Sequence, residues 1–581
     1  MNAEVVFRCG YFKSARYAAV RRAHDCGGLA GRVPHSSPAS TAIVSVARGG
    51  DTEATHDPAR PIPGLRSSAV HPRHRPESVM TQSEARAVSR ASEHSGDAPA
   101  AFQAPLDHAL VRPIIAGILL AMFLSALEQT IVAPALPTIG RVLADVEHLP
   151  FVVTAYLLAA TAVTPLFGKL SDIHGRRAAL LVAVAIFIVG SVACALAPTM
   201  WALIAARALQ GIGGGGILPI AQTIIADLLA PRERPLYQSY SAVMFMAASV
   251  LGPVLGGLLT DYVHWSLIFW INVPMGAIAL VMTDRALRRL PRHDRPHKLD
   301  LLGAGLMVAA AMVLMLALAW VGRRYAWNSP QIVAMIAGSV LLWGLFALRL
   351  ARAPEPFIPP AMLRDRVVRA IIITAFFSIG TVIGLTIMTP LYLGLVLGLN
   401  ASQSSLALIA LVTGTTIGSV VAGRLVARLA HYKPVPIVGL VISIAGLAVL
   451  AAAPAGVTLI SASALLAAIG FGLGPMYPIT TVVIQNVVEP HQFGIVTGML
   501  NFFRQLGGAI VVAAFGAIVL GALGSAGDAA ALETLAGVNR AGIDFAATFR
   551  WVFVTAAVFL ALACLAMMAV EERPLRGRGE R

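Results

Sequence analysis

The chain alternates long apolar runs with short polar turns. Each run covers roughly 18 residues or more with few or no charges, and about 20 apolar residues cross the hydrocarbon core of a bilayer as a helix. A transmembrane barrel would show short segments of alternating polarity instead. The runs lie near residues 112–137, 150–170, 178–197, 200–226, 237–259, 266–283, 300–321, 331–348, 370–396, 404–426, 435–453, 457–485, 493–520 and 549–570. They predict an all-α polytopic membrane protein with 14 transmembrane helices.

Composition agrees with this prediction. Of the 581 residues, 57% are hydrophobic and only 13% are charged, whereas a soluble domain carries about 25% charged residues. The four cysteines (Cys9, Cys26, Cys194 and Cys564) have no metal-ligand spacing, and the last two lie within apolar runs. We therefore expect free thiols rather than a metal site.

The first 110 residues differ from the rest of the chain. Residues 1–110 are rich in Arg, Ser, Pro, His and Ala and predict a disordered cytoplasmic tail. Met80 begins a stretch that would make an ordinary short tail. We therefore expect residues 1–79 to be an over-extended start, and mass spectrometry of the intact N-terminus tests this.

Basic residues are unevenly distributed between the two sides of the predicted bundle. With the N-terminus in the cytoplasm, 24 Lys and Arg residues fall at inner loops and helix ends and five at outer ones. An excess of Lys and Arg on the cytoplasmic side is general in membrane proteins. We therefore expect a multi-pass protein of the bacterial inner (plasma) membrane with both termini in the cytoplasm. The net charge of +15 then needs no nucleic-acid partner.

Two halves are visible in the sequence. The second span ends in GKLSDIHGRR (168–177) and the tenth in GRLVARLAHYK (423–433), as expected if a transporter is built from repeats around a midplane site. The predicted organisation is an N-terminal six-helix bundle (111–284), a basic cytoplasmic loop with two inserted helices (285–368), a C-terminal six-helix bundle (369–570) and a cytoplasmic tail (571–581).

Glu128 is the acidic residue that lies well inside a predicted span. It is about 24 Å along a helix from Arg112. An ionisable group inside the bilayer costs several kcal/mol and marks a candidate functional site, and the loss of water there favours the protonated carboxyl group. We expect Glu128 to carry a proton and to act as counter-ion for a cationic substrate. The alternative is a structural carboxylate hydrogen-bonded to neighbours such as Gln129.

Two intramembrane arginines are natural partners for this acid. Arg207 lies early in the fourth span and Arg504 in the thirteenth. A guanidinium group does not release its proton, so each is expected to tune an acid or to hold backbone carbonyls across a helix gap. Beside Arg207, residues 211–216 form a small-residue face for close helix packing. We expect a coupling role for Arg207, while structural and functional roles of Arg504 are equal alternatives.

The turn after the second span has the composition of a charged latch. Gly168 lets the helix end tightly, Gly175 supplies a turn, and Asp172 is placed to meet a neighbouring helix N-terminus. Three further charged residues, Arg176, Arg177 and Asp227, are expected at the same membrane level. The alternative is an ordinary basic loop, which explains the arginines but not the spacing of Gly, Asp and Gly.

The fifth span contains GPVLGG (252–257). Pro253 removes a backbone donor and bends the helix. Gly252, Gly256 and Gly257 are expected to strip one face so that another helix packs closely. Plain packing is the alternative for these glycines.

Together these segments resemble the major facilitator superfamily, in its fourteen-helix drug:proton antiporter group. The resemblance covers about residues 110–575. It rests on LEQTIVAPALPTI (127–139), GKLSDIHGRRAAL (168–180), RALQGIGGG (207–215), GPVLGG (252–257) and WINVP (270–274). It implies two six-helix bundles of the major facilitator fold plus two inserted helices.

The resemblance also implies residue roles. Glu128 would be the first-helix acid of coupling or cation recognition, and Arg207 the fourth-helix arginine tied to proton transfer. Asp172 and Arg176 with Asp227 would form the inner gate, and the four residues Gly252, Pro253, Gly256 and Gly257 would seal the resting cavity.

The chain departs from the family pattern at four positions. Glu128 stands where relatives often have Asp, and Ala248 where the fifth-helix motif begins with Gly. Ala427 and Ala430 replace the acid and the glycine in the second-half loop, so we expect a latch carried by the first half alone.

The expected function is proton-driven efflux of small lipophilic, cationic drugs by alternating access, with one-for-one exchange for monovalent cations. The expected partners are the substrate, protons, the bilayer and a periplasmic adaptor protein, with no cofactor beyond the proton gradient. Gln129, Asn272 and Arg504 are candidates for lining the cavity. The alternatives are a dedicated exporter of one metabolite or siderophore, an importer and, from another class, a membrane receptor or enzyme.

Overall fold

The computed structural model describes residues 108–288, 299–322, 324–429, 431–522 and 544–575. Contacts divide the chain into Met1–Ala98 and Pro99–Arg581, and every element below belongs to the second unit. The following predictions lie outside the described residues: the tail up to residue 107, the start at Met80, and the states of Cys9 and Cys26.

Fourteen helices in the described part of the chain are long and apolar enough to cross a membrane, which confirms the predicted number. The described residues contain no β-strand, only an isolated bridge between Val321 and Tyr325. The reason is that hydrocarbon offers backbone N–H and C=O groups no partners, so each spanning segment must satisfy them within a helix.

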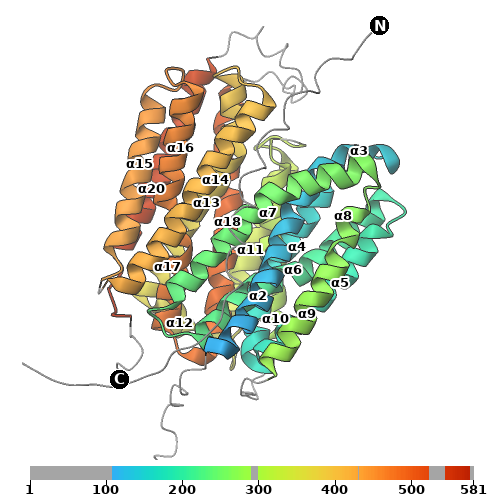
Figure 1. Cartoon of the computed structure of the whole chain (residues 1–581), viewed down its shortest axis with the longest axis vertical. Coiled ribbons are helices and arrows are strands. Elements are labelled where there is room, and N and C mark those ends of the chain that lie inside the picture. Colours follow the sequence, from blue (N-terminus) through green and yellow to red (C-terminus); the bar gives the residue numbers. More distant parts are fainter. Residues whose placement is uncertain (1–107, 289–298, 323, 430, 523–543, 576–581) are drawn as a thin grey trace, which may run out of the picture. The chain divides into compact units, whose positions relative to one another are not determined.

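The first six spans are coloured blue to green in Figure 1. The first span, Pro113–Val142, is interrupted where Pro134 and Pro137 lack the N–H that a continuous helix needs. The elements are α2 (His108–Ile131), η1 (Ala133–Ala135), α3 (Leu136–Val142), α4 (Leu149–His174), α5 (Arg176–Ala195), α6 (Met200–Leu228), α7 (Arg234–Tyr262), α8 (Leu267–Trp270) and α9 (Asn272–Leu287).

Two inserted helices and six further spans follow. The twelfth span is broken into two helices around Gly474 and Pro475, since proline lacks the N–H for the preceding turn. The elements are α10 (Leu301–Trp320), α11 (Pro330–Arg352), α12 (Pro360–Arg364), α13 (Arg366–Leu395), α14 (Ala401–Arg428), α15 (Pro434–Ala452), α16 (Leu459–Leu473), α17 (Met476–Val487), η2 (Pro490–Gln492), α18 (Phe493–Ala522) and α20 (Phe545–Met568).

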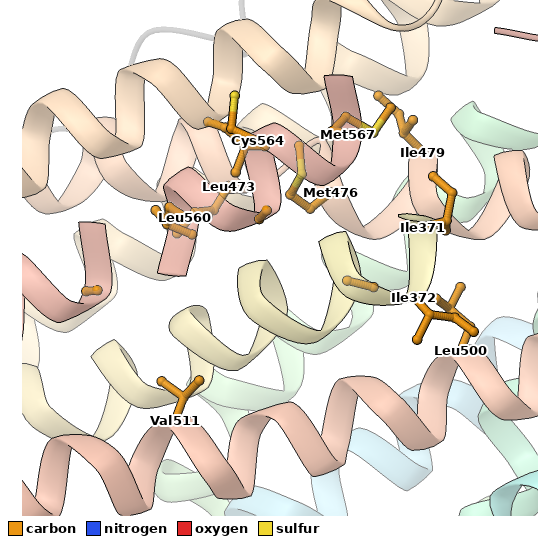
Figure 2. Packing of buried hydrophobic residues seen from close by; sticks show 14 of the residues in the cluster. Ile371, Ile372, Leu473, Met476, Ile479, Leu500, Val511, Leu560, Cys564 and Met567 are labelled. Carbon is orange, nitrogen blue, oxygen red and sulfur yellow. The ribbon is translucent and has the colours of Figure 1, made fainter. Parts of the chain in front are cut away.

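Each six-helix bundle has its own apolar core. In the second bundle the core draws on α13, α16, α17, α18 and α20, and Figure 2 shows Ile371, Met476, Leu500 and Met567 within it. The first bundle has two clusters, one around Phe187 and one around Phe269. Cys194 and Cys564 are free and buried in these regions, as the apolar runs around them predict.

The two bundles meet mainly through α4 with α18 and α7 with α14. At the first contact a Cβ on Gly168 would collide with the Gly494 carbonyl, and one on Gly498 would meet the backbone of Pro165. The inserted helix α10 packs against both α4 and α18. It therefore covers the side of the bundle interface at which these two helices run together.

Helix α6 lies unusually close to its neighbours in the first bundle. Cβ atoms on Gly211 and Gly215 would collide with backbone oxygens of α4, and one on Gly213 would collide with the backbone of α5. Small residues permit such approach in membranes, where close packing replaces the hydrophobic effect. The same closeness brings the side chains of α6 within reach of α2 and α4.

Candidate functional site

Glu128 lies midway along the first span and is completely buried. One carboxylate oxygen, Oε1, accepts a hydrogen bond from Arg207 Nη1, and the other, Oε2, accepts one from Asn272 Nδ2. Arg207 and Glu128 also form an ion pair. Both carboxylate oxygens are therefore satisfied by side chains of the first bundle, from α6 and α9.

Arg207 also donates hydrogen bonds to a backbone carbonyl of α4 and to a side chain of its own helix α6. Nε donates to the Val152 carbonyl at 3.1 Å and Nη1 to Gln210 Oε1 at 2.5 Å. Gln210 in turn donates to Ser191 Oγ at 2.8 Å. These bonds link α4, α5 and α6 to the carboxylate on α2, so Arg207 is also held by groups other than Glu128.

Aromatic rings complete the surroundings of the ion pair. The guanidinium carbon of Arg207 lies 4.5 Å from the ring centroid of Tyr156 and 5.7 Å from that of Phe269. Such contacts attract a desolvated cation by about 2 kcal/mol. Arg207 therefore has favourable partners besides the Glu128 carboxylate.

Helix α7 covers the turn that follows Glu128. A Cβ on Gly252 would collide with the Thr130 hydroxyl oxygen, and one on Gly256 with the Ile131 carbonyl. Thr130 Oγ1 also donates to the Ala248 carbonyl at 2.8 Å. This contact closes α7 onto α2 directly beyond Glu128.

Gly257 differs from the other glycines of this segment. A Cβ there would meet nothing within 4 Å. Residues four apart share a helix face, whereas the next residue lies about 100° around the helix. Gly252 and Gly256 therefore form the face that packs on α2, while the prediction that Gly257 belongs to this face is wrong.

This difference gives a matched pair of variants. Gly256→Ala should lower the free energy of unfolding by about 1–3 kcal/mol, because its Cβ would press on a backbone oxygen that cannot rotate away. Gly257→Ala should be neutral or gain up to about 1 kcal/mol from helix propensity. Thermal unfolding of both purified proteins checks this, and equal losses would contradict the assignment of the packed face.

A second polar network lies at the end of the bundle that carries the 174–176, 229–233 and 488–492 turns, which we call the basic end. Asp172 pairs with Arg176, and its two oxygens accept backbone N–H groups of Gly494 at 2.9 Å and Ile495 at 2.8 Å. These N–H groups belong to the first turn of α18, where orphan donors and the helix dipole favour an anion. Asp172 thus ties the first bundle to the second.

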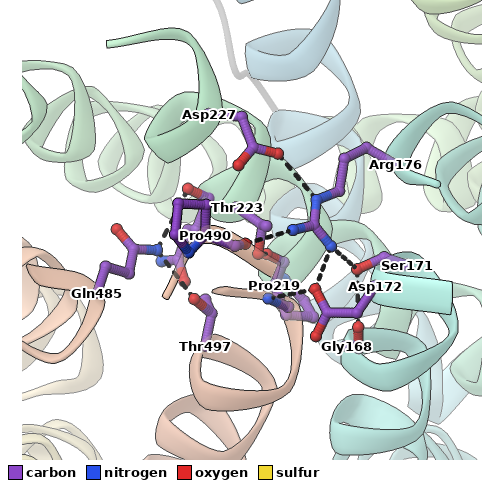
Figure 3. A network of polar contacts seen from close by, with 12 residues as sticks. Gly168, Ser171, Asp172, Arg176, Pro219, Thr223, Asp227, Gln485, Pro490 and Thr497 are labelled. Carbon is purple, nitrogen blue, oxygen red and sulfur yellow. Dashed lines mark hydrogen bonds and ion pairs between the residues drawn. The ribbon is translucent and has the colours of Figure 1, made fainter. Parts of the chain in front are cut away.

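Arg176 connects three segments at the basic end (Figure 3). It pairs with Asp172 on α4 and through Nε with Asp227 on α6 at 2.8 Å, and Nη2 donates to the Pro490 carbonyl in η2 at 3.2 Å. The turn before it needs Gly175, whose φ of +84° lies in a region that side chains rarely adopt. Arg176 therefore also crosses between the bundles.

The other charged groups near this turn stay within one bundle. Arg177 pairs with Asp284 of α9 at 2.5 Å. In the second-half copy, His431 pairs with Glu572, and Lys433 donates to the Met568 carbonyl at 2.6 Å. Among the described charged residues of the two loop copies, Asp172 and Arg176 of the first-half copy form the hydrogen bonds that cross to the other bundle.

Gln222 of α6 forms a layer of amide contacts between the bundles. Its Oε1 accepts from Asn501 Nδ2 at 2.7 Å and its Nε2 donates to the Tyr477 hydroxyl at 3.2 Å. Its backbone carbonyl accepts hydrogen bonds from Gln238 Nε2 at 3.1 Å and from Gln485 Nε2 at 3.5 Å. Gln222 is fully buried, so this layer closes the interface between the basic end and mid-depth.

The remaining predicted cavity residues are separated in space. Asn272 is buried against Glu128, whereas Gln129 is exposed and donates to the Ser125 carbonyl at 3.3 Å. Arg504 is buried in the second bundle and pairs with no acid among the described residues. Of the two roles expected for the arginines, Arg207 pairs with the acid Glu128, whereas Arg504 holds a backbone carbonyl across the gap between α18 and α17.

The sequence does not single out several polar residues of these networks, among them Gln210, Gln222 and Asn501. Gln210 lies three residues after Arg207 and so shares its helix face, which is a usable signal. Gln222 and Asn501 are uncharged polar residues inside apolar spans. Such residues need hydrogen-bond partners in a bilayer, but the sequence does not say which helix supplies them.

Comparisons with known proteins agree with this architecture. The model of the Major Facilitator Superfamily matches residues 118–512. The multidrug transporter protein MdtP of Bacillus subtilis (strain 168) is 32% identical over 406 residues, which cover 70% of this chain and 75% of that protein. Multidrug resistance protein 3 of the same organism is 33% identical over 405 residues, covering 70% and 79%.

A solved structure shows the same fold. The proton:xylose symporter XylE bound to 6-bromo-6-deoxy-D-glucose matches with a TM-score of 0.54 and 14% sequence identity, over 80% of this chain and 98% of that one. At this identity the likeness concerns the fold alone. With the family model matching more than half of the sequence, this chain belongs to the major facilitator superfamily, whose members are transporters rather than enzymes.

Proposed function

We propose that the protein is a proton-driven exporter of small lipophilic compounds, cationic ones included, in the bacterial inner membrane with both termini in the cytoplasm. The observation that carries the proposal is Glu128, a carboxyl group buried at mid-depth and ion-paired with Arg207. The names of the two Bacillus subtilis relatives support multidrug efflux. The basic end would then face the cytoplasm.

The chemistry of the pair gives a reason for coupling. An ionised Glu128 is held by Arg207 and Asn272, and a proton that reaches it removes the attraction to the guanidinium group. A cationic substrate would also bind the carboxylate and weaken its attraction to Arg207. Proton, substrate and Arg207 would therefore compete for one group, and binding one would release another.

In this proposal the basic end is the part of the bundle interface that opens and closes. Asp172 and Arg176 close the interface onto α18 and η2, and the Gln222 layer lies behind them. In an alternating-access cycle these contacts break when the cavity opens to the cytoplasm and form again when it opens outward. Glu128 would exchange its proton in the conformations in which α2 and α7 separate.

Transport driven by an imposed gradient tests the proposal. In proteoliposomes of the full-length protein, a pH gradient should drive uptake or release of a fluorescent lipophilic cation, and a protonophore should reduce the rate to that of empty vesicles. Transport that persists at the same rate without a gradient would contradict proton coupling. A panel of cationic, neutral and anionic compounds distinguishes broad efflux from export of one metabolite.

A further inference from the structure

Arg504 is a buried positive charge without a negative partner in the described part of the chain. It lies midway along the span Pro490–Gly521 and is 2% exposed. Arg207, at the corresponding degree of burial in the first bundle, is neutralised by Glu128. Inserting an unpaired arginine at the centre of a membrane helix costs about 2.5–3.5 kcal/mol of free energy. Such a cost indicates that the charge has a role in the protein.

The groups around Arg504 are all neutral. Nη2 donates to the Tyr477 carbonyl at 2.9 Å and to the hydroxyls of Thr480 at 2.7 Å and Thr481 at 2.8 Å, and Nη1 donates to Asn501 Oδ1 at 3.2 Å. Its buried Nε has no hydrogen-bond partner among the residues that the structure describes. The guanidinium carbon lies 4.4 Å from the Tyr477 ring centroid, which offsets part of the desolvation.

Two of these neighbours also form the contact between the bundles. Tyr477 and Asn501 both bond to Gln222 of α6, and the Tyr477 ring contacts that of Phe245 on α7 at 6.4 Å. Tyr477 is only half-buried. Any movement that separates α6 from α17 and α18 would therefore free the Tyr477 hydroxyl and remove Gln222 from the Asn501 amide, whose Nδ2 also donates to the Thr497 carbonyl at 2.9 Å, next to the Arg504 charge.

We propose that Arg504 is the anion-binding subsite of the transport path, which takes a carboxylate or another oxyanion carried by a lipophilic substrate, with Tyr477 and Asn501 as further donors. This inference rests on the proposed export function. A purely structural role, in which Arg504 holds α17 to α18 by hydrogen bonds, needs only neutral donors. A permanent charge beside an opening interface, by contrast, attracts an anion strongly in a low dielectric. Charge-assisted hydrogen bonds are the stronger class.

A pair of compounds that differ only in charge tests this site. An aromatic fluorescent dye with a free carboxylate and its methyl ester are titrated against the purified full-length protein, with fluorescence polarisation as the readout. The wild type should prefer the carboxylate by about tenfold or more, as expected for a charge-assisted bond. Equal affinities for the wild type would overturn the proposal without any variant.

Variants of Arg504 distinguish anion binding by its charge from a purely structural role. Arg504→Gln should abolish the preference, while Arg504→Lys should keep part of it because the charge remains. Arg550→Gln, which removes an exposed arginine on α20, should leave the ratio unchanged. A ratio that stays at the wild-type value in Arg504→Gln would refute the subsite, as would a Lys variant without preference. Binding needs no gradient, so failure of proton coupling would leave this test intact.

Discussion

Glu128→Gln should abolish proton-coupled export and destabilise the protein by about 3–5 kcal/mol. The loss of stability follows because Arg207 would remain buried at 1% exposure without its counter-ion, and breaking a buried pair by removing one partner costs this much. The loss of export follows because glutamine cannot take up a proton. Substrate-induced proton movement in proteoliposomes and thermal unfolding measure the two effects.

A double variant separates these effects. Glu128→Gln combined with Arg207→Gln removes both charges, so it should recover much of the stability while proton-coupled export stays at background. Glu147→Gln, which removes an exposed acid in the turn before α4, serves as the control and should behave like the wild type. Export that returns together with stability would show that Glu128 has only a structural role.

Asp172→Asn should open the basic end and slow transport strongly. Asp172 accepts two backbone N–H groups of α18 and pairs with Arg176, and losing charged hydrogen bonds of this kind costs about 1.5–3 kcal/mol. The population of the closed basic end should therefore fall by on the order of 10- to 100-fold. A cysteine at Ser171, buried at 1%, would report opening through faster reaction with a polar maleimide.

The labelling experiment needs a protein from which the four native cysteines have been removed. It also needs a control variant at another acidic residue near α4. Asp145, whose carboxylate contacts His148 at 2.9 Å in the turn between α3 and α4, lies at the other end of α4 from Asp172. Asp145→Asn should leave the labelling rate of the Ser171 cysteine unchanged. The same acceleration in both variants would argue against a gate held by Asp172.

The spans could be predicted from the sequence because hydrocarbon thickness fixes how long an apolar run must be. Details inside the spans could not. The first span continues to Val142 through a short 3-10 helix, beyond the predicted end at residue 137, and the twelfth is broken at Gly474. These features depend on how Pro134 and Pro475 are accommodated by neighbouring helices, which hydropathy does not describe.

The candidate site, too, could be predicted from the sequence only in part. Glu128 and Arg207 attract attention in the sequence because a charge in a span is costly. Their pairing depends on how α6 lies against α2, and hydropathy does not show that Arg504 instead donates to a backbone carbonyl of α17. Gly257 was grouped with Gly256 by proximity in sequence, whereas the helical period separates them.

The proposed export mechanism depends on one carboxyl group, that of Glu128, which would exchange a proton when a cation binds. Calorimetric titration of a monovalent lipophilic cation into the purified protein, repeated in buffers with different ionisation enthalpies, counts the protons released on binding. At a pH low enough for Glu128 to hold a proton in the free protein, the wild type should release about one proton per bound cation, and Glu128→Gln should release none. The same proton release from the wild type and the variant would contradict the account.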